Sequence, residues 1–195
     1  MLNVFEQPWT LLTAAIIILL FTLIVRRFSG ETQPLWQWLI PIFLAATAFG
    51  LDILVQTYRE QINNTINTAL RAAEEENPDA IEMILSDNYK DSYHNTKEDL
   101  MHYCRALLSK PLVEKNIRTD SIIEISPPKA TVTLVVLTRF DKDSYVYKNF
   151  KRVQLTKIKL YLQKEQGKKW LINQAEILEI DIQPVDWNQI GQLRW

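Results

Sequence analysis

The chain has 195 residues and nearly balanced charge, with 22 Lys and Arg against 23 Asp and Glu. This length allows one ordinary domain and an additional segment. The charge balance, without a basic stripe, argues against a nucleic-acid partner. The single cysteine, Cys104, excludes an internal disulfide and leaves the redox compartment open.

Two apolar segments occupy the first part of the chain. Residues 9–25 contain no charge, and residues 35–55 contain only Asp52. A helix of about 20 residues crosses the roughly 30 Å of bilayer hydrocarbon. Tryptophans stand near the segment ends, where indole rings favour the membrane interface. The sequence therefore predicts a two-helix transmembrane anchor over residues 1–58. A cleaved signal peptide is disfavoured because no Lys or Arg precedes the first segment.

Basic residues near the spans predict how the anchor is oriented. Arg26 and Arg27 lie in the connection between the two segments, and Arg59 follows the second. Because cytoplasmic loops are enriched in Lys and Arg, we expect the connection to face the cytoplasm and the C-terminal domain to be extracytoplasmic. Asp52 is close enough to the end of its segment to reach the interface, which disfavours a role in moving ions or protons.

Three helices are expected next, in the first part of a domain predicted over residues 59–182. The first covers residues 59–76 and follows the second span after a short break. Its apolar residues recur at helical spacing: Ile62, Ile66, Ala69, Leu70 and Ala73. The second begins at Pro78, with Asn77 as its N-cap. The third begins after Thr96, which forms a capping box with Asp99, and ends before Pro111.

After Pro111 the hydrophobic period changes to two, which is typical of strands. Strand-like runs cover residues 113–126, 130–140, 150–163 and 170–182. Turn residues separate them. Three helices followed by about four antiparallel strands define an α+β fold, with the helices packed on one face of a curved sheet.

This order of elements resembles the nuclear transport factor 2-like superfamily, the cone-shaped fold shared with ketosteroid isomerase and SnoaL-like cyclases. The similar residues are ALRAAEEE at 69–76, NPDA at 77–80, LSDNYKD at 85–91 and WLI at 170–172. The resemblance covers residues 60–182. It implies a cone pocket, but the superfamily includes enzymes, ligand binders and assembly modules, so fold alone does not give function. The two predicted spans are a departure from its soluble enzymes.

Residues 85–104 hold both histidines and the only cysteine of the chain, together with three tyrosines and three aspartates. In a cone fold the loop after the second helix lies near the pocket mouth. We expect a pocket lined by Tyr89, Asp91, Tyr93, His94, Tyr103 and Trp170. Asp87, Asp91 or His94 could transfer a proton there, and a tyrosine could stabilise an oxyanion. The favoured interpretation is structural, with acids that serve turns and tyrosines that bury their rings.

No cofactor, metal or catalytic residue is predicted. His102 and Cys104 are two apart on a helix and point in different directions. Cys104 falls on the apolar stripe of the third helix, where a thiol is unreactive. The few glycines form no phosphate loop.

The tail, residues 183–195, has apolar side chains suited to a partner or a membrane surface: Trp187, Ile190, Leu193 and Trp195. The alternative is that it packs on its own domain. The predicted function is a membrane-anchored, non-catalytic module that binds other membrane proteins or a second copy of itself. The alternative is a domain that binds a small apolar ligand, or an isomerase or cyclase-type enzyme, using the cone pocket.

Overall fold

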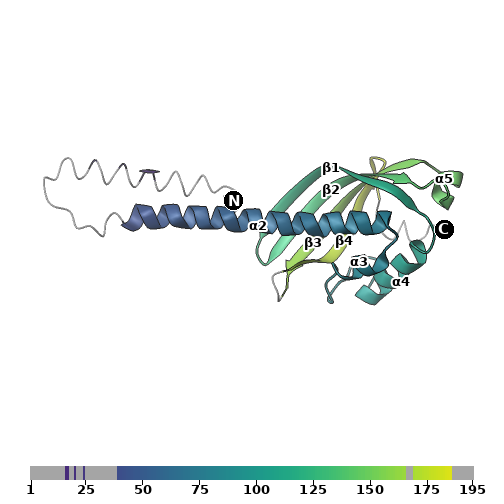
Figure 1. The fold of residues 1–195 in the computed structure, drawn as a ribbon, viewed down its shortest axis with the longest axis horizontal. Helices are drawn as coiled ribbons and strands as arrows, with labels where there is room; N and C mark the ends of the chain where they lie inside the picture. The colour runs from purple at the N-terminus through teal and green to yellow at the C-terminus, as the bar shows by residue number, and fades with distance from the viewer. Residues whose placement is uncertain (1–15, 18–19, 21–23, 25–38, 166–168, 186–195) are drawn as a thin grey trace. The chain divides into compact units, whose positions relative to one another are not determined.

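The computed structural model describes residues 39–165 and 169–185, together with Ile16, Ile17, Leu20 and Ile24. Contacts divide the chain into two units, Met1–Glu60 and Gln61–Trp195. Helix α2, Leu39–Glu74, runs from the first unit into the second (Figure 1). The predicted break before Arg59 is therefore absent, because apolar and polar helix-forming residues follow one another without Gly or Pro between residues 51 and 74.

The predicted transmembrane segments lie largely in the first unit. The first, residues 9–25, falls outside the described residues except at four positions, and residues 35–38 of the second are likewise outside them. Among the residues that the structure describes, no helix is long and apolar enough to cross a membrane. Several large apolar side chains in the first half of α2 are exposed, including Ile42, Phe43 and Ile53.

The helices of the second unit begin and end where the local sequence provides caps. Helix α2 ends as Asn77 N donates to the Ala72 carbonyl at 2.9 Å, with Glu76 in the left-handed region at φ 51°. Helix α3, Pro78–Glu82, is capped by the Asn77 side chain. Helix α4, Lys97–Leu107, has the predicted capping box, in which the side chains of Thr96 and Asp99 each accept from the other's backbone N–H.

The sheet has five antiparallel strands that pair in sequence order: β1 Val113–Ser126, β2 Lys129–Phe140, β3 Val153–Lys164, β4 Trp170–Ile180 and β5 Gln183–Pro184. The prediction of about four strands missed β5. Asp181 and Ile182, expected within the fourth strand, instead have φ of 49° and 69° and reverse the chain. Gln183 and Pro184 then pair with Ile180 and Glu179.

A short helix not expected from the sequence joins β2 to β3. Helix α5, Tyr145–Asn149, is capped by Ser144, whose hydroxyl accepts from Tyr147 N. Phe150, expected at the start of a strand, follows this helix and lies outside β3. The five-residue helix is too short to show a helical period, and its polar flanks resemble an ordinary turn.

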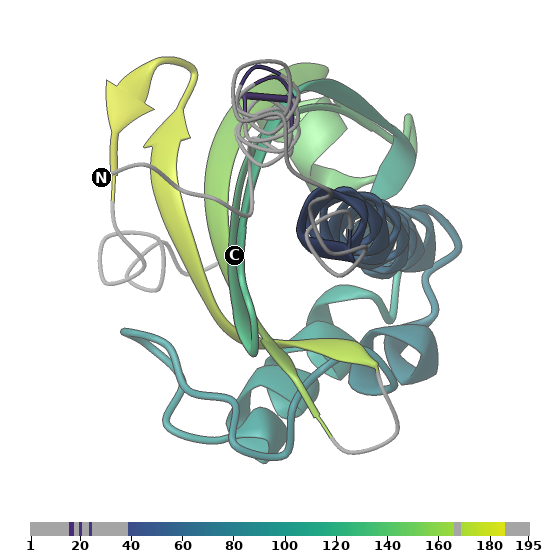
Figure 2. The ribbon, with the colours of Figure 1, turned by 90° about the vertical axis from the view of Figure 1, so that its left-hand side faces the viewer.

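The hydrophobic core lies between the helices and one face of the sheet. On that face, Val132, Leu134 and Val136 of β2 are at most 3% exposed. They pair with Leu160, Ile158 and Thr156 of β3. Ile62 and Ile66 of α2 are also buried. Figure 2 shows this helix lying against one side of the curved sheet. Polar contacts add to this packing: Asn116 N donates to the Glu74 carboxylate at 2.7 Å.

We call the opposite side of the sheet the open face. Its central residues are half-buried and alternate with those of the core: Thr131, Thr133, Val135 and Leu137 on β2, with their partners Tyr161, Lys159, Lys157 and Leu155 on β3. Ile117 and Ile122 of β1 extend it. Of the described helices, α2, α3 and α4 belong to the core side of the sheet, so none of these three covers the open face (Figures 1 and 2).

Candidate functional site

The segment between α3 and α4 is fixed to the start of β4. Ser86 N donates to the Ile172 carbonyl at 2.9 Å, and Ile172 N donates to the Ile84 carbonyl at 2.9 Å. Lys90 N then donates to the Asn173 carbonyl at 3.0 Å. These bonds fix the path of the chain into residues 89–94, where the sequence concentrates its candidate catalytic groups.

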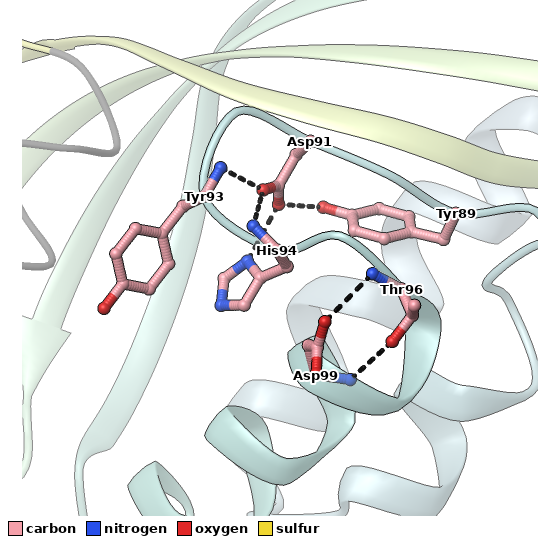
Figure 3. Close-up of polar contacts among 6 residues, drawn as sticks. All are labelled: Tyr89, Asp91, Tyr93, His94, Thr96 and Asp99. Atoms are coloured by element: carbon pink, nitrogen blue, oxygen red, sulfur yellow. Dashed lines mark hydrogen bonds and ion pairs between the residues drawn. The ribbon is translucent and has the colours of Figure 1, made fainter.

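Asp91 is the centre of a buried hydrogen-bond network in this segment (Figure 3). Its Oδ1 accepts from the backbone N–H groups of Tyr93, at 2.7 Å, and His94, at 2.5 Å. Its Oδ2 accepts from the Tyr89 hydroxyl at 2.6 Å and lies 3.0 Å from His94 Nδ1. A carboxylate offers about four acceptor sites. All four are therefore engaged by this chain's own groups.

The electrostatics of the network favour an ionised, inert Asp91. Burial opposes ionisation, but the hydrogen bonds from His94, Tyr89 and Tyr93 hold the pKa of Asp91 below its ordinary value. Burial, together with the hydrogen bond to Asp91, raises the pKa of the Tyr89 phenol, so the phenol stays protonated. A base with a lowered pKa and no unoccupied acceptor is poorly suited to abstract a proton from a substrate.

The structure brings several of the predicted pocket residues close together through ring contacts. The His94 ring lies between Tyr93 and Tyr103, with ring centroids 4.9 and 5.5 Å away. Burial raises the pKa of the Tyr103 phenol. Trp170 is buried in the core, and its carbonyl accepts from the Thr65 hydroxyl at 2.9 Å.

Asp87, the other acidic candidate, stands apart from this network. Its side chain is 90% exposed, and its Oδ1 accepts from Lys97 Nζ at 3.0 Å. An exposed carboxylate of this kind lacks the enclosed, apolar surroundings that are typical of a catalytic acid or base.

A pocket of about 700 Å³ opens elsewhere in the domain, between α4, the segment that follows it and α5. Its apolar lining includes Leu107, Leu112, Phe140 and Val146. Of the residues predicted to line a pocket, only Tyr103 contributes to it. Sequence reasoning missed this pocket, because its walls come from segments that become neighbours only in the folded sheet.

The described residues contain no group of three or more His, Cys, Asp or Glu side chains placed to hold a metal ion. His102 is exposed, and Cys104 is half-buried on α4. Burial raises the pKa of the Cys104 thiol to about 11. The apolar tail residues Trp187, Ile190, Leu193 and Trp195 lie outside the described part of the chain.

Neither protein-family models nor curated proteins match this sequence. Solved structures do match the fold. A function-unknown protein from Mycobacterium tuberculosis superposes with a TM-score of 0.53 at 13% identity, covering 65% of this chain and 77% of that one. A nuclear transport factor 2-like superfamily protein from Salmonella enterica gives 0.51 at 9% identity, with 67% and 93% covered.

A third structure supports the same assignment. A protein of unknown function with a cystatin-like fold, from Nostoc punctiforme, gives a TM-score of 0.50 at 15% identity, covering 63% of this chain and 90% of that one. The domain therefore has the α+β, nuclear transport factor 2-like fold that the sequence resemblance implied. At these identities the likeness defines the fold and not an activity.

Proposed function

We propose that this chain is a non-catalytic assembly module that is held at a membrane by residues 1–58 and binds a second copy of itself through the open face. The observation that carries the proposal is the apolar surface left on that face. Ile117 is 43% exposed, Ile122 is 58% exposed and Val153 is 50% exposed. Exposed large apolar side chains on one face of a sheet are typical of protein interaction sites.

The charges of the open face favour a second copy over an unlike partner. Lys157 and Lys159 of β3 lie beside Glu179 and Glu176 of β4. Lys157 Nζ is 2.8 Å from the Glu179 carboxylate. A two-fold interface brings the same patch from both subunits together, so any charges in that patch must include both signs. Rows of lysine and glutamate next to an apolar area meet this requirement.

The membrane segments support the proposal from the sequence side. Residues 35–55 have the length and composition of a span, and residues 9–25 have the composition of one but are slightly short. Confinement to a bilayer raises the effective concentration of one copy near another, so even a modest interface can form. Because Arg26 and Arg27 favour a cytoplasmic location for the connection between the two segments, the domain is expected outside the cytoplasm. A reporter that is active only in the cytoplasm, fused after Trp195, should then give no signal, whereas a strong signal would reverse the orientation.

The alternative, an isomerase or cyclase-type enzyme that uses residues 89–103, has less support. General acid–base catalysis needs a group with an accessible lone pair or proton and a pKa near the working pH. Asp91 has neither, because its four acceptor sites are occupied and its pKa is lowered. The geometry instead uses Asp91 to hold the chain between Tyr89 and His94.

The experiment that tests the proposal is the molar mass of the full chain in mild detergent, measured by light scattering. We expect the wild-type chain to be a dimer and Ile122→Glu to be a monomer, because the substitution places a charge in the apolar contact. Met83→Glu is the matched control. Met83 is 72% exposed and is the C-cap residue of α3, outside the strands of the sheet. A monomeric wild type, or equal dissociation by both variants, would contradict the proposal.

A further inference from the structure

The pocket between α4 and α5 combines an apolar interior with two lysines, Lys110 and Lys148. Leu107 of α4, Leu112, Phe140 of β2 and Val146 of α5 supply the apolar part. At about 700 Å³, its volume lies within the range of roughly 300–1,000 Å³ that is typical of small-molecule sites. The open face contributes none of the six lining residues on which this argument rests, so the pocket is separate from the proposed dimer contact.

The two lysines of the pocket differ in their partners. Lys148 Nζ lies 3.2 Å from the Asp143 carboxylate and also donates to the Asp143 carbonyl, so its charge is neutralised locally. Lys110 lies in the segment after α4 and forms no hydrogen bond or ion pair with another described residue. Among the residues that the structure describes, the pocket therefore presents Lys110 without a counter-charge beside a wall of carbon atoms.

We propose that this pocket binds an amphiphilic carboxylate, a molecule with an apolar chain and one negative head group. The apolar chain would lie against Leu107, Leu112 and Phe140, which removes carbon surface from water. The head group would meet Lys110 at the mouth, where a charge-assisted hydrogen bond can form without burying an ion pair. Neither part alone accounts for the site, since a purely apolar ligand leaves Lys110 unused and a small anion leaves the interior empty.

The test uses the full chain in lipid nanodiscs and laurate that carries a photoactivatable diazirine. After irradiation, mass spectrometry identifies which peptides are labelled. We expect labelling in residues 103–112 and 140–154, and we expect unlabelled laurate to suppress it. Dodecanol has the same chain length without the charge, so it should compete about tenfold more weakly, the effect of one charge-assisted hydrogen bond.

Four variants, one of them a control, separate the contributions of charge and shape. Lys110→Gln should weaken labelling of both peptides about tenfold, and Lys110→Arg should restore it. Lys142→Gln is the matched control, because Lys142 is an exposed lysine near α5 that does not line the pocket, and it should change nothing. Val146→Trp should block labelling by filling the interior.

Two results would overturn the proposal. One is the absence of label from both pocket peptides of the wild-type chain. The other is equal labelling of the wild type and Lys110→Gln, with dodecanol competing as well as laurate. The lysine variants are surface changes, so their comparison decides the question even if Val146→Trp does not fold.

Discussion

The Tyr89 hydroxyl donates to Asp91 Oδ2 across 2.6 Å inside the domain, and both residues are at most 6% exposed. This bond links the side chains of two residues that are close in sequence. The other carboxylate oxygen of Asp91, Oδ1, accepts hydrogen bonds from the backbone N–H groups of Tyr93 and His94. A buried charge that loses its partners is strongly destabilising, whereas a fully satisfied network fixes one conformation. Substitution of Asp91 should therefore lower the free energy of unfolding of the domain.

Asp91→Asn should lower the free energy of unfolding by about 2–4 kcal/mol, because the amide replaces an acceptor with a donor and weakens several hydrogen bonds to a charged group. Thermal unfolding of the full chain in detergent, followed by near-ultraviolet circular dichroism, measures the change. Asp87→Asn is the control. It removes an exposed ion pair with Lys97 and should change stability by no more than about 0.5 kcal/mol. Similar losses in both variants would contradict the structural role of Asp91.

The lowered pKa of Asp91 also sets a dependence on pH. Because the folded-state pKa lies below the ordinary value of 3.8, ionised Asp91 stabilises the native state above that pH. This stabilisation is lost as the pH falls through the folded-state pKa. The wild-type unfolding temperature should therefore fall in acid more steeply than that of Asp91→Asn. Asp181, whose pKa is lowered mainly by its hydrogen bond from Lys151, is present in both proteins and cancels in the comparison. Parallel curves between about pH 7 and pH 2 would count against this linkage.

Cys104 should be slow to react in the folded chain. With its pKa raised by burial from 9.0 to about 11, its thiolate fraction near neutral pH is about one hundredfold lower than that of an ordinary thiol. The rate of alkylation by iodoacetamide measures this directly. In denaturant the same thiol should react at the rate of a free cysteine. Rapid modification of the folded protein would show that Cys104 is more accessible than its position on α4 indicates.

The capping box of α4 should contribute measurably to stability. Thr96→Ala removes the side-chain acceptor for Asp99 N, which lies 3.1 Å away, and should cost about 1 kcal/mol. Ser92→Ala is a suitable control because Ser92 is exposed and its side chain makes no hydrogen bond with the described residues. The two unfolding temperatures decide the matter, and a Thr96 variant as stable as the control would rule out a significant contribution.

Local signals account for what the sequence predicted correctly. Thr96 and Asp99 satisfy each other across one turn, and the alternation of β2 reflects a strand with one buried face. The resemblance to the nuclear transport factor 2-like fold came from the order of these elements, read from the sequence.

Features that depend on contacts between residues far apart in the sequence could not be predicted from local sequence patterns. The two-residue strand β5 exists only because Asp181 and Ile182 reverse the chain. The partners of Asp91 were nearby in sequence, but their convergence required the anchoring of residues 84–90 to β4. The pocket beside α5 joins α4 to the ends of β2 and β3, which no local pattern brings together.

The most direct test of the central claim is hydroxyl-radical footprinting of the wild-type full chain in detergent at increasing protein concentration. If the open face binds a second copy, Ile122 and Tyr161 should become progressively protected from oxidation. Met83 and Tyr145, which are 72% and 60% exposed and lie off that face, should be oxidised equally at every concentration. Constant oxidation of Ile122 and Tyr161 over the same range would contradict the assembly role.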